Sequence, residues 1–125
     1  MQNGHVALIA EDNAGFRESI ISMLEPLAVS CITAVDGHEA IEVLRDRSRD
    51  VHLLITDMEM PRRDGWDVIR AAREHRGDEL PIIMQTGQTS FAYVPSRARD
   101  LGIVLIDKLD LRARLVPAVR DALGL

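Results

Sequence analysis

The sequence predicts an α/β fold: a doubly wound, parallel, five-stranded sheet with the strand order 2-1-3-4-5. Five short runs rich in Val, Ile and Leu recur along the chain, and each ends near a polar residue. Helical patterns of apolar residues lie between these runs, so strand and helix alternate five times. This alternation indicates a parallel sheet with helices on both faces, and right-handed crossovers leave few topologies for it.

The predicted strands are short and lack the polar–apolar alternation of a half-buried strand. Such runs suit strands that are buried on both faces, as in a parallel sheet. In chain order they cover residues 6–12, 30–36, 51–57, 80–86 and 103–108.

Apolar residues at helical spacing follow the strands. Asp36 and Glu39 match a capping box at the start of the second helix, and Asp64 can cap the third, which fades near Gly77. The apolar positions are Phe16, Ile20, Met23, Leu24 and Leu27 in the first helix, Ala40, Ile41, Val43 and Leu44 in the second, Trp66, Val68, Ile69 and Ala72 in the third, and Leu115, Val119 and Leu123 in the last.

Prolines interrupt the fourth and fifth helical segments. Proline fits the first turn of a helix but disrupts its interior. We therefore expect the fourth helix to begin near Pro95 after a long loop. The fifth helix is expected either to begin late or to kink at Pro117.

Length and composition indicate one ordinary globular domain spanning residues 1–125, because 46% of the 125 residues are hydrophobic. The formal net charge of −5 argues against a nucleic-acid-binding protein, which usually carries a basic face. A single cysteine, Cys31, excludes an internal disulfide framework. Fourteen arginines accompany one lysine, Lys108.

No targeting or membrane segment is visible in the sequence. The opening residues 1–5 lack the Lys or Arg of a signal peptide, and the longest charge-free stretch, 80–96, is polar and short for a membrane span. The expectation is a soluble cytoplasmic protein with no membrane partner and no direct nucleic-acid partner.

Polar residues at the predicted strand ends converge at one edge of the sheet. Glu11 and Asp12 end the first strand and Asp57 ends the third, and both ends flank the predicted switch point of the strand order. Thr86 and Lys108 reach the same edge from the fourth and fifth strands. Acids and Thr at strand ends are common in loops, but five such residues at consecutive strand ends favour a functional site.

Three carboxylates held close together repel one another, and a divalent cation would relieve the repulsion. Oxygen ligands alone favour a hard ion such as Mg²⁺. A carboxylate nucleophile beside a hard metal, a cation and a hydroxyl donor suits phosphoryl transfer, where positioning and charge neutralisation do most of the work.

The stretch 53–65, LLITDMEMPRRDG, resembles the signature of response-regulator receiver domains. It has the family's order of phosphoacceptor Asp57, then Met-Pro, then Asp64-Gly65. The Glu11-Asp12 pair, the Thr86-Gly87 step and Lys108 also fall in the family's order and spacing. The resemblance covers roughly residues 6–123 and implies the flavodoxin-like (βα)5 fold of that family.

The resemblance implies a phosphoacceptor that acts on its own aspartate rather than a turnover enzyme. It implies that a sensor histidine kinase or a phosphotransfer protein donates a phosphoryl group to Asp57. Mg²⁺ would be held by Asp12, Asp57 and the backbone carbonyl of Glu59, with Glu11 acting mainly through water.

In the active state, the resemblance implies that the Thr86 hydroxyl bonds one phosphoryl oxygen and that Lys108 pairs with another. The downstream target of such a signal is a protein whose identity the sequence does not show.

Four features depart from the family pattern. The first acid is Glu11 instead of the commoner Asp, which is a frequent variant. Leu109 follows Lys108 where the family usually has proline, so the turn must be built differently here. Leu105 replaces the switching aromatic residue, and the two prolines in the last helices alter the usual output face.

Two other functions compete with a phosphorylated receiver. A receiver-like interaction module that works without phosphorylation is favoured by the departures at Leu105 and Leu109, and disfavoured by the complete set of site residues. An aspartate-nucleophile phosphatase is loosely compatible with Asp57 and Glu59, but such enzymes need a larger chain with an inserted cap.

Phe91 and Tyr93, in the loop before the fourth helix, either fold back into the core or stay exposed as a partner contact.

Overall fold

A computed structural model describes residues 4–125 and shows a five-stranded parallel sheet in the order β2-β1-β3-β4-β5. The fold class and the strand order predicted from the sequence are therefore confirmed. The predicted single domain of residues 1–125 includes residues 1–3, which lie outside the described part. The strands are β1 (Val6–Ala10), β2 (Ser30–Ala34), β3 (Leu53–Asp57), β4 (Ile82–Thr86) and β5 (Val104–Asp107).

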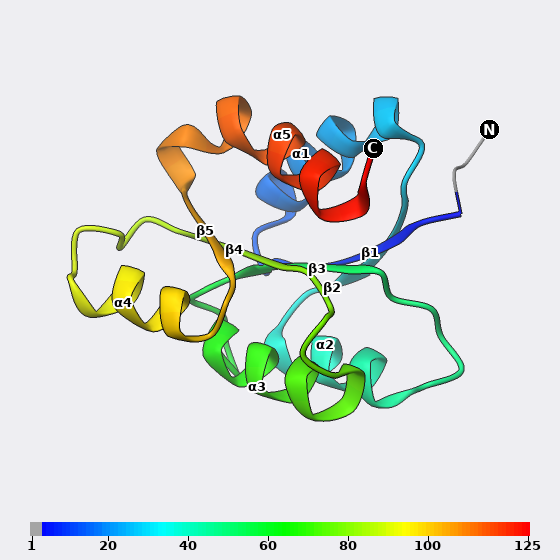
Figure 1. Ribbon diagram of the computed structural model, residues 1–125, viewed down its shortest axis with the longest axis horizontal. Coiled ribbons are helices and arrows are strands. Elements are labelled where there is room, and N and C mark those ends of the chain that lie inside the picture. Colours follow the sequence, from blue (N-terminus) through cyan, green and yellow to red (C-terminus); the bar gives the residue numbers. More distant parts are fainter. Residues whose placement is uncertain (1–3) are drawn as a thin grey trace.

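Helices cover both faces of the sheet, with α1 and α5 on one side and α2, α3 and α4 on the other (Figure 1). The helices are α1 (Ala14–Leu24), α2 (Gly37–Arg45), α3 (Gly65–Arg76), α4 (Tyr93–Asp100) and α5 (Leu111–Leu123). Two short 3-10 helices, η1 (Glu25–Leu27) and η2 (Lys108–Asp110), follow α1 and β5. No helix among residues 4–125 is long and apolar enough to cross a membrane.

The sheet separates two hydrophobic cores, because successive strand residues point to opposite faces. Leu8, Leu54 and Met84 belong to the core beneath α2, α3 and α4. Ile9, Ile55 and the other alternate residues belong to the core beneath α1 and α5. β3 and β4 are buried along their whole length, which explains why their sequences lack polar–apolar alternation.

The helix starts follow the capping signals in the sequence. The Asp36 side chain accepts a hydrogen bond from the Glu39 backbone N–H, while the Glu39 carboxylate reaches the backbone N–H of Val35 rather than that of Asp36. At α3 the capping box is complete, because Asp64 and Asp67 exchange both bonds.

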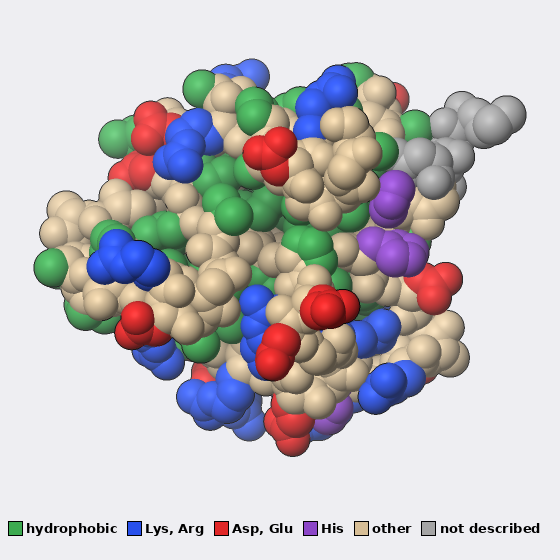
Figure 2. Space-filling model, viewed as in Figure 1, with side chains coloured by type: hydrophobic (Ala, Val, Ile, Leu, Met, Phe, Trp, Pro, Cys, Tyr) green, Lys and Arg blue, Asp and Glu red, His purple; other side chains and the backbone are tan. Residues whose placement is uncertain are grey.

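The two prolines have different effects. α4 begins at Tyr93, so Pro95 lies in its first turn, close to the predicted start. α5 begins at Leu111 and continues through Pro117, so the predicted late start is wrong. Pro117 lines a hollow of about 500 Å³ between α5 and the edge strand β5, where apolar side chains reach the surface (Figure 2).

Candidate functional site

One row of side chains at the carboxyl end of the sheet builds the site. Ile9, Ile55 and Ile83 lie in the core under α1 and α5. The residues two positions further along these strands point to the same side of the sheet, since strand side chains repeat with a period of two. These residues are Glu11 after β1, Asp57 at the end of β3 and Gln85 in β4.

The Asp57 carboxylate is buried and held from two directions. Its Oδ1 accepts a hydrogen bond from the Met58 backbone N–H at 2.9 Å, and its Oδ2 accepts one from Lys108 Nζ at 3.1 Å. Burial raises the pKa of Asp57 above its ordinary value, and the Lys108 hydrogen bond and charge oppose the rise. The carboxylate therefore depends on nearby positive charge to stay ionised.

Glu11 is fully buried beside Asp57. Its Oε2 accepts a hydrogen bond from the Asn13 backbone N–H at 3.0 Å, and its Oε1 accepts one from Gln85 Nε2 at 3.1 Å. Burial raises the pKa of Glu11 to about 7, the Asn13 bond opposes the rise, and the Asp57 charge adds to it. The family resemblance implies that Glu11 acts through water, and this stays a prediction.

Asp12 is exposed at the rim and completes a cluster of acids. Ligand oxygens of Glu11, Asp12 and Asp57 all lie within 4.8 Å of one another. This spacing and the purely oxygen donor set suit a hard divalent cation such as Mg²⁺.

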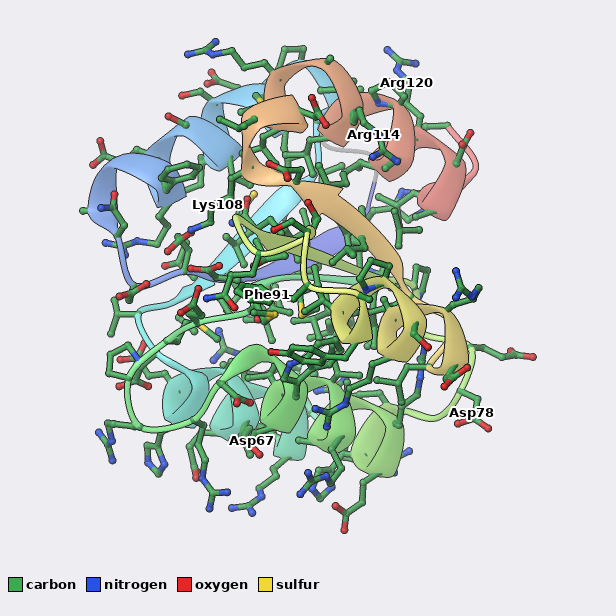
Figure 3. The ribbon with its side chains drawn as sticks, turned by 90° about the vertical axis from the view of Figure 1, so that its left-hand side faces the viewer. Asp67, Asp78, Phe91, Lys108, Arg114 and Arg120 are labelled. Atoms are coloured by element: carbon green, nitrogen blue, oxygen red, sulfur yellow. The ribbon has the colours of Figure 1, made fainter. Side chains whose placement is uncertain are left out.

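Lys108 is the cation that faces these acids. Its Nζ lies 3.1 Å from Asp57 Oδ2, 3.7 Å from Glu11 Oε1, and 4.6 Å from the centre of the Phe16 ring. Burial acts to lower the pKa of Lys108, but the hydrogen bond and charge of Asp57 outweigh it and the pKa is raised. Figure 3 looks onto this end of the sheet, with Lys108 on the α1 and α5 side.

Thr86 lies next to the site but its hydroxyl is engaged elsewhere. The residue is buried, and its Oγ1 accepts a hydrogen bond from the backbone N–H of Gln88 at 3.0 Å. Thr86 shares the strand face of Met84, which belongs to the opposite core from Ile83. The same oxygen can accept from Gln88 and donate its own hydrogen, so the bond to a phosphoryl oxygen implied by the resemblance requires the side chain to turn from this strand face toward Asp57.

The loop after Asp57 folds back on that residue. The Gly65 N–H donates to the Met58 carbonyl at 2.8 Å, and a Cβ at Gly65 would lie 2.3 Å from the Asp57 carbonyl oxygen. Only glycine allows this close approach. Glu59 contributes a backbone hydrogen bond that lowers the pKa of Asp57, while a metal-binding role for its carbonyl stays a prediction.

The turn after β5 is built without proline. The Asp107 side chain accepts a hydrogen bond from the Leu109 backbone N–H at 2.9 Å, and residues Lys108–Asp110 form η2. No cis peptide bond occurs among the described residues. The turn is therefore built by a side-chain cap, which differs from the Lys-Pro turn usual in the family as the sequence predicted, and Leu109 is left 94% exposed.

Phe91 and Tyr93 are both more than half exposed, with ring centres 6.4 Å apart, so the exposed alternative is correct. Thr89 in the same loop donates a hydrogen bond to the Asp107 carboxylate. The loop is therefore tied to β5 while its aromatic side chains face solvent.

Sequence reasoning missed three contacts to the site acids and lysine. Gln85 donates to the Glu11 carboxylate, Arg17 donates to the Glu11 backbone carbonyl at 2.9 Å, and the Phe16 ring lies under Lys108. Gln85 had a signal, because it is an amide inside an otherwise buried apolar strand. Phe16 and Arg17 had none, because their positions fit an ordinary amphipathic helix.

Comparison with known proteins agrees with this geometry. The family model described as "Response regulator receiver domain" matches residues 7–110. The chain is 32% identical over 100 residues to Regulator of RpoS from Escherichia coli (strain K12), covering 80% of this chain and 28% of that protein. It is 27% identical over 93 residues to chemotaxis protein CheV2 from Helicobacter pylori, covering 72% of this chain and 30% of that protein.

The chain thus spans less than a third of the length of these two curated relatives. Solved structures match it over nearly its whole length. A response regulator receiver protein from Sinorhizobium medicae WSM419 has a TM-score of 0.84 at 25% identity, covering 98% of this chain and 96% of that one. A response regulator receiver protein from Pseudomonas putida has a TM-score of 0.82 at 27% identity, covering 97% of this chain and 99% of that one. By the family match and by this structural agreement, the chain belongs to the response-regulator receiver domains of two-component signalling.

Proposed function

We propose that this receiver domain accepts a phosphoryl group on Asp57 in a Mg²⁺-dependent reaction and signals by a change of conformation. The phosphodonor is a sensor histidine kinase or a phosphotransfer protein. One observation carries the proposal: the buried Asp57 carboxylate bonds to Lys108 Nζ at 3.1 Å and lies within 4.8 Å of ligand oxygens of Glu11 and Asp12. A cytoplasmic location follows from the proposal, since the donor is charged from ATP there.

The residues present fit a divalent cation. The three carboxylates lie around the Lys108 ammonium, which pairs with Glu11 and Asp57, and burial raises the pKa values of both of these acids. We assign Asp12, Asp57 and the Glu59 carbonyl to direct binding and Glu11 to binding mainly through water. When bound, Mg²⁺ supplies positive charge for the phosphoryl oxygens and relieves the repulsion among the acids.

The protein groups position the reaction. An Asp57 carboxylate oxygen attacks phosphorus in line with the phosphohistidine N–P bond, which breaks and leaves its electron pair on the donor's imidazole. Lys108 shifts from the carboxylate to a phosphoryl oxygen, and the Thr86 hydroxyl donates its hydrogen to another once the side chain turns toward Asp57. Water later hydrolyses the acyl phosphate, so the domain acts as a phosphoacceptor rather than a turnover enzyme.

The test is the mass of the protein after incubation with acetyl phosphate and Mg²⁺. We expect one added phosphoryl group in the wild type and none in Asp57→Asn. Unchanged labelling of Asp57→Asn would remove Asp57 from its role. Asp12→Ala should abolish Mg²⁺ binding, and with it the Mg²⁺-dependent labelling, while leaving the fold intact, because Asp12 is exposed.

The alternative is an interaction module that works without phosphorylation. Leu105 and the exposed Leu109 favour it, because the family usually has a switching aromatic residue at the first position and a proline at the second. Pro95 and Pro117, in the last two helices, also favour it. This alternative would be supported if the wild-type protein stays unlabelled in the same experiment and its melting temperature does not change when Mg²⁺ is added.

A further inference from the structure

Gln85 is a fully buried polar side chain that reaches across the site. It pairs with Asp57 in the register of β3 and β4, and its amide extends over β3 to the acid that follows β1. There Gln85 Nε2 donates to Glu11 Oε1 at 3.1 Å. The reverse amide orientation would place two acceptor oxygens face to face, so the bond itself determines which end of the amide faces Glu11.

The other end of this amide finds no hydrogen-bond partner among residues 4–125. Gln85 Oε1 is buried and makes no hydrogen bond within the described residues. A buried acceptor without a partner costs about 1–3 kcal/mol, and an aliphatic side chain of similar shape would avoid that cost. Packing alone therefore favours an apolar residue here, and what the amide adds is its donor to Glu11.

That donor decides which way the Glu11 carboxylate faces. Oε2 is held by the Asn13 backbone N–H, and Oε1 is shared between Gln85 Nε2 and the more distant Lys108 Nζ at 3.7 Å. Without the amide, the Lys108 ammonium, 3.7 Å away, is the cation beside Oε1. Lys108 would then be drawn toward Glu11 and away from Asp57, and Glu11 would turn from the cluster of ligand oxygens.

We propose that Gln85 is a positioning residue for the metal site, which holds the Glu11 carboxylate in register with Asp12 and Asp57 and so sets the affinity for the divalent cation. This inference rests on the proposed function. It assigns Gln85 no contact with the phosphoryl group, and its effect passes through Glu11.

The test compares Gln85→Met with the control Met84→Leu. Methionine keeps the length and shape of glutamine but has no donor, and Met84 is a buried neighbour on the opposite strand face. The Mg²⁺ dissociation constant is measured by calorimetric titration and by the melting temperature against Mg²⁺ concentration. We expect Gln85→Met to bind Mg²⁺ at least tenfold more weakly, as for other residues that orient metal ligands, and Met84→Leu to bind as the wild type does.

A double-mutant cycle shows whether the effect passes through Glu11. Glu11→Asp keeps a carboxylate but shortens it by one methylene, which takes it out of reach of the Gln85 amide. In that background, Gln85→Met should change Mg²⁺ affinity less than twofold. Raising Mg²⁺ to saturation should restore most of the acetyl phosphate labelling that Gln85→Met loses at low Mg²⁺, because the lost affinity is then made up by concentration; labelling that stays low at saturation would refute a role limited to metal affinity.

The possible outcomes distinguish a failure of the proposed Mg²⁺-dependent function from a failure of the role assigned to Gln85. If the wild type shows no Mg²⁺ binding, the proposed function fails. If the wild type binds Mg²⁺ and Gln85→Met binds it equally well, the function stands and the role of Gln85 is refuted. An equal loss in the Glu11→Asp background would also refute it. Should Gln85→Met not fold, Gln85→Asn serves instead, since it keeps the amide but withdraws it from Glu11.

Discussion

At the scale of single residues, the site is a place where acids outnumber bases in a buried setting. Burial raises the pKa of Glu11 from 4.5 to about 7 and also raises that of Asp57. Between pH 4.5 and 7 the folded chain therefore binds more protons than the unfolded chain does. Stability must fall as the pH rises through that window, because the folded state disfavours the ionised acids.

The first prediction follows from this linkage. Without metal, the free energy of unfolding should drop between pH 5 and pH 8 by up to about 3 kcal/mol, at about 1.4 kcal/mol per pKa unit. Glu11→Gln has no proton to lose at this position, so most of that fall in the free energy of unfolding should disappear in this variant. Urea unfolding at the two pH values in EDTA measures it. A wild type as stable at pH 8 as at pH 5 would contradict the raised pKa of Glu11.

The second prediction concerns Gly65, whose added Cβ would lie 2.3 Å from the Asp57 carbonyl oxygen and 2.8 Å from Met58 Cα. Because backbone atoms must shift to admit the methyl group, Gly65→Ala should cost about 3 kcal/mol or more of stability. Gly87→Ala is the matched control, since a Cβ there meets nothing within 4 Å. Equal urea midpoints for the two variants would show that the loop yields without strain.

At the scale of elements, Arg76 holds the end of α2 from the end of α3. Its guanidinium donates to the backbone carbonyls of Val43, Leu44, Asp46 and Arg49 at 2.7 to 3.1 Å. The last carbonyls of a helix lack partners within it, so one side chain completes the C-terminus of α2 and the loop behind it.

The third prediction is that Arg76→Lys destabilises the chain by about 2 kcal/mol and increases amide exchange at residues 43–49. Lysine keeps the charge but cannot present a planar fork to several carbonyls. Arg70→Lys is the control, because the Arg70 guanidinium is largely exposed and pairs with Asp67 at 3.9 Å, and such surface pairs contribute little. If amide exchange at residues 43–49 were the same in the two variants, the positive charge at position 76 alone would account for the stabilisation of the α2 C-terminus.

The loop between β4 and α4 is the element most directly coupled to the site. Its Gln88 N–H depends on Thr86 Oγ1, so a Thr86 hydroxyl that turns to a phosphoryl group releases the loop. Leu105 is a weak alternative switch, since burying a leucine is worth about 1.5–3 kcal/mol and a full population switch needs about 5.5 kcal/mol.

The fourth prediction is that a phosphoryl mimic with Mg²⁺ changes amide exchange over residues 87–95 more than over 103–107. The exposed pair Phe91 and Tyr93 is expected to reorder with the loop. Thr86→Ala provides the control, because it removes the hydroxyl and should expose the Gln88 amide even without the mimic. Changes centred on 103–107 with a silent 87–95 loop would overturn this account of the switch.

At the scale of the whole molecule, the strand pattern was sufficient to predict the architecture. Short apolar runs such as β3 and β4 are buried on both faces, and this burial is what their unbroken Val, Ile and Leu content indicated. The site acids were predictable for the same reason, since the carboxyl ends of parallel strands share one edge of the sheet. Their assignment to metal or phosphoryl groups remains a prediction.

Contacts between side chains were not predictable in the same way. The bond from Gln85 to Glu11 joins residues 74 positions apart, and local patterns carry no information about such a pair. The late start considered for α5 was wrong because packing outweighed local propensity, with Leu115 and Val119 buried on either side of Pro117. The alternative of a kink at Pro117 stays a prediction.

A chain with a single lysine carries its own spectroscopic reporter. Lys108 holds the one side-chain amine among the 125 residues, and its Nζ lies 3.1 Å from Asp57. Reductive methylation with ¹³C-formaldehyde would therefore label the site and the N-terminal amine alone. We expect the Lys108 methyl resonance to shift on adding Mg²⁺ and again on phosphorylation, and the amine to stay protonated to higher pH than an exposed lysine modified in the same way, in keeping with the raised pKa of Lys108. The occupancy of the site could thus be followed from one carbon signal in an otherwise unlabelled protein.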